Sequence, residues 1–373
     1  MKILMAAGGT GGHVNPALAV AGEIREKYPE AEIVFVGTPD KIESRIVPAA
    51  GFELKTVEAS GFKRSFSPAA IKANLLTVKR TIAGSFTVKK IIKEFEPDVV
   101  VGFGGYVTGP VLRAAAKMGI PTAIHEQNAY PGVTNKMLAP MVDCVMLTVE
   151  AAGKLLKCKN EPVVTGLPVR GELLEADGAV SRKELGFDGR PIVLCMGGSL
   201  GADPINKAIV EVLCAKQNDC NFIVSTGSKG VWVFDELRSR GIDPDNCPNI
   251  QVREYIDDMA RCLSAADLVI CRAGASSLSE FEALGKPSIL IPSPYVAENH
   301  QFHNAMALVN NGAASILEEK DLTGESLTAL IDGLCADTSK LKEIGANAKK
   351  MAFINAKEEI ASMVVSLASK TEG

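Results

Sequence analysis

Short apolar runs alternate with amphipathic helical patterns along nearly the whole chain. The runs in the N-terminal half are residues 2–7, 32–38, 98–104, 122–127, 144–149 and 162–166. Those in the C-terminal half are residues 191–198, 221–227, 250–256, 267–274 and 287–294. The runs are continuously apolar and rich in β-branched residues, which is typical of parallel strands covered on both faces. The pattern therefore predicts an α/β protein built from βαβ units.

The segment 167–190 interrupts this rhythm. It holds one proline, four glycines and mixed charge without a strand pattern, which predicts an interdomain connection. Each half opens with a strand, a glycine turn and a helix, at residues 6–21 and 195–209. We therefore predict two Rossmann-like, doubly wound parallel-sheet domains, residues 1–166 and 167–354, facing each other across a cleft. Ligands of such sheets lie outside the carboxyl ends of the strands, so the cleft is the predicted site.

Composition narrows the class of protein. Of 373 residues, 47% are hydrophobic and 23% charged, which excludes a disordered chain. The nine cysteines form no C-x-x-C pair, which disfavours a disulfide framework or a zinc site and indicates a reducing compartment. No apolar run approaches the roughly 18 residues that span a membrane, and the short apolar start is a buried strand rather than a signal peptide. The formal net charge of −4 disfavours a nucleic-acid binder.

One segment nevertheless concentrates positive charge. Residues 61–94 contain eight Lys and Arg residues and one Glu, a net charge of +7, so the rest of the chain carries −11. At about 100° per residue, Lys72, Lys79 and Lys90 share one helical face beside an apolar stripe. Such a helix predicts docking on an anionic membrane surface. The alternative is a helix that packs on the core and exposes its lysines to water.

The first glycine loop, residues 8–13, follows the first predicted strand. It matches neither G-x-G-x-x-G nor a P-loop, but its glycines allow close backbone approach to a ligand. The simpler interpretation is a tight turn, whereas a neutral His13 at a strand end could act as a general base. A second flexible loop at a strand end contains Gly104, Gly105 and Tyr106.

A polar cluster ends the predicted strand at 122–127. His125, Glu126, Gln127 and Asn128 are consecutive, and Asn135 comes seven residues later on the next helix. Burying these side chains is costly without a ligand or a dense hydrogen-bond network. A plain polar turn is the alternative.

The C-terminal half offers an anion site. Residues 272–277 open a helix that contains Glu280, and small residues at a helix N-terminus bind anions. Glu280 could accept hydrogen bonds from a ribose diol, and Arg170 and Arg272 could offset phosphate charge. The alternative is simple N-capping by Ser276 or Ser277 with Glu280 as the capping-box partner. The Asp-Pro-Asp sequence at 243–245 lies in a turn, and no metal is predicted there.

Several motifs together resemble a known family. AGGTGGHVNPALAVA, GFGGYVTGP, HEQNAYPGVTNK, TGLPVR, GGSLGA, EYIDDM and CRAGASSLSE occur in the order found in the family 28 glycosyltransferases of bacterial cell-wall synthesis. The likeness runs from residue 5 to about residue 310. It implies the two-domain GT-B architecture, with the C-terminal helix, about residues 355–373, packing back on the first domain.

The resemblance also implies roles for individual residues. His13, His125 and Glu126 are the candidate catalytic groups, and which of them is the base stays open. The acceptor side comprises Gly104, Gly105, Tyr106 and Asn135. The UDP-N-acetylglucosamine (UDP-GlcNAc) set comprises Thr10, Gly11, Gly12, Asn128, Arg170, Ser199, Ile256, Ala275, Ser276, Ser277, Glu280, His300 and Gln301.

The implied reaction is inverting transfer of N-acetylglucosamine from UDP-GlcNAc to the 4-hydroxyl of the lipid-linked N-acetylmuramyl-pentapeptide, without metal or cofactor. The implied location is the cytoplasmic face of the cell membrane, with other cell-wall or division proteins as possible partners. The alternatives are a UDP-GlcNAc 2-epimerase, a glycolipid glycosyltransferase, or a non-catalytic nucleotide-sugar sensor.

Overall fold

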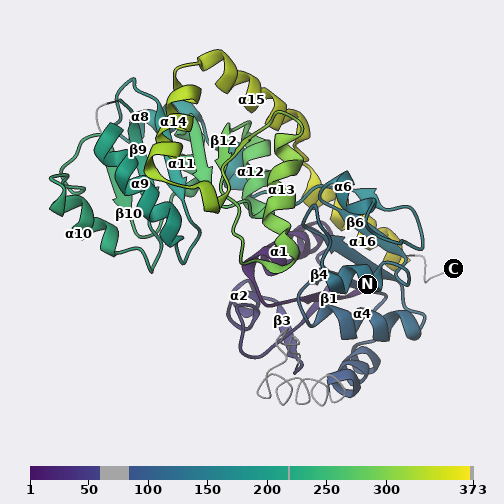
Figure 1. Ribbon diagram of the computed structural model, residues 1–373. Coiled ribbons are helices and arrows are strands. Elements are labelled where there is room, and N and C mark those ends of the chain that lie inside the picture. The colour runs from purple at the N-terminus through teal and green to yellow at the C-terminus, as the bar shows by residue number, and fades with distance from the viewer. Residues whose placement is uncertain (59–83, 217–218, 370–373) are drawn as a thin grey trace, which may run out of the picture. The chain divides into compact units, whose positions relative to one another are not determined.

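The computed structural model describes residues 1–58, 84–216 and 219–369 (Figure 1). The chain divides into two compact units. Unit 1 comprises Met1–Pro168 and Ile354–Gly373, and unit 2 comprises Val169–Phe353.

Unit 1 is built on a parallel sheet of seven strands in the order β3-β2-β1-β4-β5-β6-β7. Its strands are β1 (Lys2–Ala7), β2 (Glu32–Gly37), β3 (Glu53–Thr56), β4 (Val99–Gly104), β5 (Thr122–Glu126), β6 (Cys144–Leu147) and β7 (Val163–Val164). Its helices are α1 (Gly11–Lys27), α2 (Glu43–Ala49), α4 (Thr108–Lys117), α5 (Val133–Leu138), α6 (Glu150–Gly153) and α16 (Ala356–Ser369). Residues 84–95 are also helical.

Unit 2 is built on a parallel sheet of six strands in the order β10-β9-β8-β11-β12-β13. Its strands are β8 (Ile192–Met196), β9 (Asn221–Ser225), β10 (Ile250–Arg253), β11 (Leu268–Cys271), β12 (Ser288–Leu290) and β13 (Ser315–Ile316). Its α-helices are α7 (Gly171–Glu175), α8 (Gly178–Glu184), α9 (Asp203–Lys216), α10 (Trp232–Ser239), α11 (Met259–Ala265), α12 (Ala275–Leu284), α13 (His300–Val309), α14 (Gly324–Cys335) and α15 (Thr338–Met351). Two short 3-10 helices cover Ala297–Asn299 and Glu319–Asp321.

The predicted α/β fold is confirmed, and each predicted apolar run contains a strand. Alternate residues of β1 explain the continuous apolarity: Ile3 and Met5 enter one buried cluster, whereas Leu4 and Ala6 enter another. Both faces of the strand are therefore covered, as parallel sheets require. The pattern missed β3 and β13, which are edge strands with few fully buried side chains.

The prediction that 167–190 is a connection is wrong beyond its first residues. Short helices α7 and α8 occupy this segment, and Leu173 and Leu185 are buried in the core of unit 2. The glycines argued against helices in this segment, but they lie at the helix ends: Gly171 and Gly178 each begin a helix. Short helices of this kind leave too few residues for a periodic pattern.

The basic segment is only partly within the described residues. Lys63, Arg64, Lys72, Lys79 and Arg80 lie outside them. In the helical residues 84–95, Val88, Ile91 and Ile92 are buried in the core, while Lys89, Lys90 and Lys93 are exposed. Phe86 is 70% exposed on the same helix. Within the part of the chain that the structure describes, no helix has the length and apolarity needed to cross a membrane.

The C-terminal helix α16, yellow in Figure 1, packs on α1 within unit 1. Glu23 of α1 is buried and accepts from Lys357 of α16 at 2.7 Å and from Lys27 of its own helix at 2.8 Å. These hydrogen bonds, the one from Lys27 first, lower the pKa of Glu23 despite its burial. The carboxylate therefore ties a distant segment of the chain to the first helix.

A matched pair of variants tests this tie. Lys357→Met is expected to lower the free energy of unfolding by about 1–2 kcal/mol, because a charge-assisted bond to a buried carboxylate is lost. Lys27→Met removes only a pair within one helix and should cost about 0.3–0.5 kcal/mol. Urea unfolding of both variants measures the difference, and equal losses would contradict the role given to Lys357.

Candidate active site

The first glycine loop follows β1 and leads into α1. Thr10 is the N-cap of α1 in an extended conformation, and its side chain does not cap the helix. The Nδ1 atom of His13 lies 3.0 Å from the carbonyl oxygen of Gly8 and 3.3 Å from Thr10 Oγ1. Because a carbonyl oxygen can only accept, this contact places a ring proton on Nδ1, and in the neutral imidazole that leaves the lone pair on Nε2. His13 is thus held in the tautomer that a general base needs at Nε2.

The loop after β4 packs directly on this histidine. Gly104 and Gly105 have φ angles of +110° and +87°, which glycine adopts without strain. A Cβ atom on Gly104 would lie 2.6 Å from His13 Cδ2, and one on Gly105 would collide with the carbonyl oxygen of Gly8. The hydroxyl of Thr108 donates to the carbonyl oxygen of Gly104 at 2.7 Å. The two predicted loops therefore meet at the carboxyl end of the sheet.

His125 has a different environment from His13. It is fully buried, its Nε2–H donates to the carbonyl oxygen of Gly166 at 2.8 Å, and its Nδ1 accepts from Gln127 at 3.2 Å. The ring also stacks on Phe103 with centroids 5.9 Å apart. Burial lowers the pKa of His125 to about 4. The imidazole is neutral, has both nitrogens engaged, and fits a supporting role better than proton transfer.

Because the buried imidazole of His125 stays neutral, we predict that the stability of the protein depends on pH. Between pH 6.5 and about 4, His125 is protonated in the unfolded chain but stays neutral in the folded chain. The free energy of unfolding therefore falls as the pH falls. The shift corresponds to about 3 kcal/mol across this window. We expect His125→Gln, whose amide can donate to Gly166, to flatten that part of the curve of unfolding free energy against pH. An unchanged slope would contradict the buried neutral state.

Glu126 and Asn135 belong to a buried polar network. One oxygen of Glu126 accepts from the backbone N–H of Asn128 at 2.9 Å, and the other accepts from Gly132 N–H at 3.0 Å and Asn135 Nδ2 at 2.8 Å. Glu126 is 2% exposed, so the carboxylate orders the loop from 127 to 132. Among the described residues, Asn135 Oδ1 is a buried oxygen without a hydrogen-bond partner.

Sequence reasoning missed Glu43. This residue begins α2, is fully buried, and accepts from the N–H of Gly9 at 2.9 Å and from the N–H and hydroxyl of Thr38 at 3.0 and 2.6 Å. It thereby joins the loops that follow β1 and β2. The available signal was a Glu five residues after Thr38, the last residue of the predicted run 32–38.

In unit 2, the glycine loop after β8 presses against the loop after β9. Gly198 and Gly201 have φ angles of +90° and +80°, and the N–H of Ser228 donates to the carbonyl oxygen of Ser199 at 3.2 Å. A Cβ atom on Gly201 would collide with the carbonyl oxygen of Thr226. This packing leaves Ser199 exposed at the carboxyl end of the sheet.

Helix α12 presents its N-terminus at the same end of the sheet. Its N-cap is Gly274, and no side chain caps it. The capping-box alternative for Ser276 and Ser277 is therefore wrong, since Glu280 instead accepts from Arg170 Nε at 2.8 Å. An uncapped helix N-terminus lined by small residues suits a phosphate group.

Arg170 and Glu280 form a partly buried ion pair. Burial raises the pKa of Glu280, and the hydrogen bond from Arg170 opposes that shift. Burial alone would lower the pKa of Arg170, but the bond to Glu280 raises it overall. Arg170 also donates to Glu172 at 3.2 Å. The pair places a cation and a carboxylate beside the N-terminal turn of α12.

Arg272 does not join this group. Its guanidinium pairs with Glu319 and donates to the carbonyl oxygen of Ile291 at 3.1 Å, with 15% of the side chain exposed. The carboxylate of Glu319, with 10% of its side chain exposed, pairs with this guanidinium, and the role of Arg272 toward phosphate stays a prediction.

The remaining donor candidates lie on neighbouring loops of unit 2. Ile256 is buried and Tyr255 is 61% exposed beside it. Gln301 accepts from the N–H of Ser293 at 2.8 Å, and His300 begins α13. Glu298 and Asn299 have φ angles of +54° and +51°, a conformation that costs non-glycine residues free energy and is found at functional loops. Among the described residues, no cluster of three metal-binding side chains occurs, and Asp245 pairs with Arg238.

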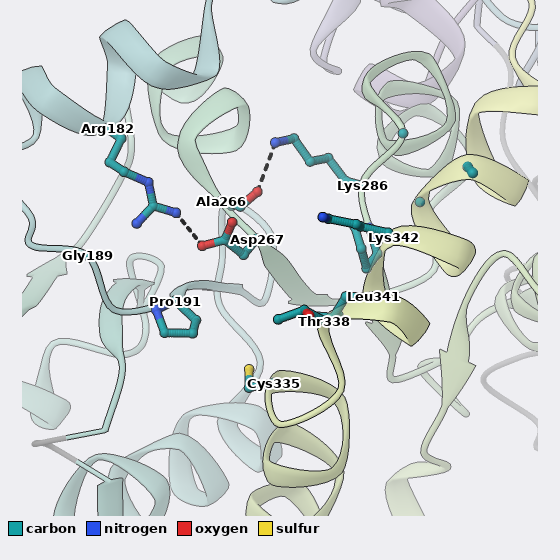
Figure 2. Close-up of a pocket in the computed structure, with 14 residues that line it drawn as sticks. Arg182, Gly189, Pro191, Ala266, Asp267, Lys286, Cys335, Thr338, Leu341 and Lys342 are labelled. Atoms are coloured by element: carbon teal, nitrogen blue, oxygen red, sulfur yellow. Dashed lines mark hydrogen bonds and ion pairs between the residues drawn. The ribbon is translucent and has the colours of Figure 1, made fainter.

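A cavity of about 520 Å³ lies elsewhere in unit 2 (Figure 2). Its lining comes from the amino ends of β8, β11 and β12 and from α15, opposite the loops described above. Lys286 donates to the carbonyl oxygens of Ser264 and Ala266 at 2.6 and 2.8 Å, and burial lowers its pKa to about 8. The predicted nucleotide-sugar residues do not line this cavity.

Comparison with solved structures defines the class. A MurG from Acinetobacter baumannii matches with a TM-score of 0.79 and 29% identity over 98% of this chain and 99% of that one. A UDP-GlcNAc 2-epimerase from Neisseria meningitidis shares the fold, with a TM-score of 0.65 and 14% identity over 98% of this chain and all of that one. Together with the two parallel sheets, these matches define a GT-B glycosyltransferase fold.

The sequence comparisons give the family. Residues 3–147 match the N-terminal domain of glycosyltransferase family 28, and residues 192–360 match its C-terminal domain. The UDP-N-acetylglucosamine--N-acetylmuramyl-(pentapeptide) pyrophosphoryl-undecaprenol N-acetylglucosamine transferase of Acetivibrio thermocellus is 44% identical over 98% of this chain and 97% of its own. The chain belongs to glycosyltransferase family 28.

Proposed function

We propose that this enzyme transfers N-acetylglucosamine from UDP-GlcNAc to the 4-hydroxyl of the N-acetylmuramyl unit of the undecaprenyl-pyrophosphoryl-linked pentapeptide, lipid I, giving lipid II. The full-length similarity to relatives named for this reaction supports the substrate pair. The single structural observation that carries the chemistry is the 3.0 Å contact between His13 Nδ1 and the carbonyl oxygen of Gly8, which in the neutral imidazole leaves the lone pair on Nε2.

In the proposed mechanism, His13 Nε2 removes the proton from the attacking acceptor hydroxyl. His125 and Glu126 are positioning residues, because both are buried and satisfied by neighbouring groups. Gly104, Gly105 and Tyr106 line the acceptor side, and the unpaired Oδ1 of Asn135 supports an ordering role there. Thr10, Gly11, Gly12 and Asn128, on the loops of unit 1, are the residues of that unit that we assign to UDP-GlcNAc.

The donor binds in unit 2 in this proposal. The N–H groups at Ala275, Ser276 and Ser277 receive the diphosphate, and Glu280 accepts from the ribose hydroxyls. Arg170 and Ser199 stabilise the charge that develops on the departing UDP, a task that metal ions perform in other transferases. The backbone of Ile256 binds the uracil, and His300 and Gln301 contact the sugar hydroxyls.

The basic segment 61–94 supports a proposal about where in the cell the protein acts. Exposed Lys89, Lys90 and Lys93 with Phe86 support docking of this face on an anionic membrane. We propose a peripheral protein on the cytoplasmic face, where a lipid-linked acceptor is presented. Cell-wall or division proteins are further candidate partners.

An acceptor-dependence assay tests the proposal against the epimerase alternative. UDP release from UDP-GlcNAc is expected only with a lipid I analogue present, and EDTA should leave the rate unchanged. Epimerisation of the donor without any acceptor would overturn the proposed reaction in favour of a 2-epimerase. Binding of UDP-GlcNAc without turnover under either condition would favour a sensor.

A further inference from the structure

We propose that Glu43 acts on His13 through a single peptide group, in a carboxylate–peptide–imidazole relay that fixes the tautomer and orientation of the base. The proposal deepens the role given to His13 and rests on it. Glu43 is a positioning residue in this arrangement, since it touches neither substrate nor the reacting atoms.

The relay runs through the peptide that joins Gly8 and Gly9. The N–H of Gly9 donates to Glu43 Oε2 at 2.9 Å. The carbonyl oxygen of Gly8, on the other side of the same peptide, accepts from His13 Nδ1–H at 3.0 Å. The two hydrogen bonds therefore share one planar, conjugated amide group.

The carboxylate end of the relay is rigid. Glu43 is fully buried, and its other oxygen, Oε1, accepts from the N–H and hydroxyl of Thr38. Two glycines leave room for the side chain: a Cβ on Gly8 would lie 2.6 Å from Glu43 Oε1, and one on Gly37 would lie 2.6 Å from Glu43 Cγ. The neighbouring backbone is thus shaped around this carboxylate.

The arrangement has a direct electrostatic consequence. When a carboxylate accepts a hydrogen bond from an amide N–H, it shifts electron density within that amide toward the carbonyl oxygen. Linked hydrogen bonds also strengthen one another in a low dielectric. The Gly8 oxygen therefore holds the Nδ1 proton more firmly and stabilises the imidazolium that forms when Nε2 accepts a proton. Catalytic histidines gain the same benefit from a carboxylate bonded directly to Nδ1.

The experiment compares Glu43→Gln with Thr38→Val in the full-length protein. The first removes the charge and keeps the shape, and the second removes one bond to the same carboxylate and leaves the Gly9 contact intact. We expect Glu43→Gln to lower kcat roughly tenfold without changing KM for UDP-GlcNAc, well short of the roughly 10⁴-fold loss seen for a directly bonded carboxylate. The ¹⁵N shifts of the His13 ring should change from the Nδ1–H tautomer to a mixture.

Thr38→Val should retain the wild-type tautomer and keep kcat within about twofold, while lowering Tm to a similar degree as Glu43→Gln. Equal effects of both variants on tautomer and kcat would overturn the relay and leave Glu43 a purely structural residue. If Glu43→Gln does not fold, the wild-type protein decides: a Gly9 amide proton without a downfield shift and exchange protection would overturn the proposal. Because the NMR measurements need no turnover, they stay decisive even if the proposed transfer reaction fails.

Discussion

Replacing His13 by Ala is expected to lower kcat by about 10²- to 10⁴-fold, the range that a positioned general base contributes. The reason is geometric, since the Gly8 carbonyl oxygen holds the proton on Nδ1 and leaves Nε2 to accept one from the acceptor hydroxyl. The affinity for UDP-GlcNAc should change little, because the contacts proposed for the nucleotide lie in unit 2. Single-turnover rates and donor titration together separate these effects.

A matched control is available on α13. His303 packs edge-on against Phe302 and takes no part in the proposed chemistry, so His303→Ala should retain near wild-type kcat. A wild-type unfolding midpoint of His13→Ala shows that the variant is folded. A His13→Ala enzyme with normal turnover would remove the base assignment.

Replacing Arg170 by Ala is the second change with a large expected effect. Loss of one preorganised donor to a developing negative charge typically costs about 10²- to 10³-fold in rate, and we expect kcat/KM for UDP-GlcNAc to fall by that amount. The substitution also removes the partner of Glu280, a carboxylate that is 13% exposed. Burial already raises the pKa of Glu280, and loss of Arg170 raises it further.

Two further variants separate these contributions. Arg170→Lys keeps the charge without the planar fork and should recover only part of the activity. Arg238→Ala removes an exposed guanidinium that pairs with Asp235 and Asp245, and it should leave kcat/KM unchanged. An Arg170→Ala enzyme with wild-type kcat/KM would contradict the leaving-group role.

The strands could be predicted because a strand buried on both faces is apolar at every position. Val193 and Cys195 enter one core cluster of unit 2, and Ile192 and Leu194 enter the other, so every position of the run is apolar. Edge strand β3 lacks this continuous apolar pattern, since Glu53, Lys55 and Thr56 are exposed.

The site was harder to predict because residue type does not reveal what a side chain contacts. His13 lies just after β1 and His125 lies within β5 of the same sheet. His13 contacts a glycine loop, whereas His125 is buried against Phe103 and Gln127. Arg272 pairs with Glu319, which lies 47 residues further along the chain, and the sequence around Arg272 does not indicate that partner. Pairing between residues this far apart in the sequence depends on the tertiary structure, so it could not be predicted from a single sequence.

The central claim is tested most directly by following the sugar itself. UDP-GlcNAc labelled in the N-acetylglucosamine is incubated with the enzyme, a lipid I analogue and EDTA, and the lipid fraction is then extracted and hydrolysed. We predict that the label enters the lipid fraction and is recovered as a β-1,4-linked disaccharide with N-acetylmuramic acid. Label that remains in the aqueous phase as free or epimerised sugar, or a product that forms only after a metal is restored, would contradict the account.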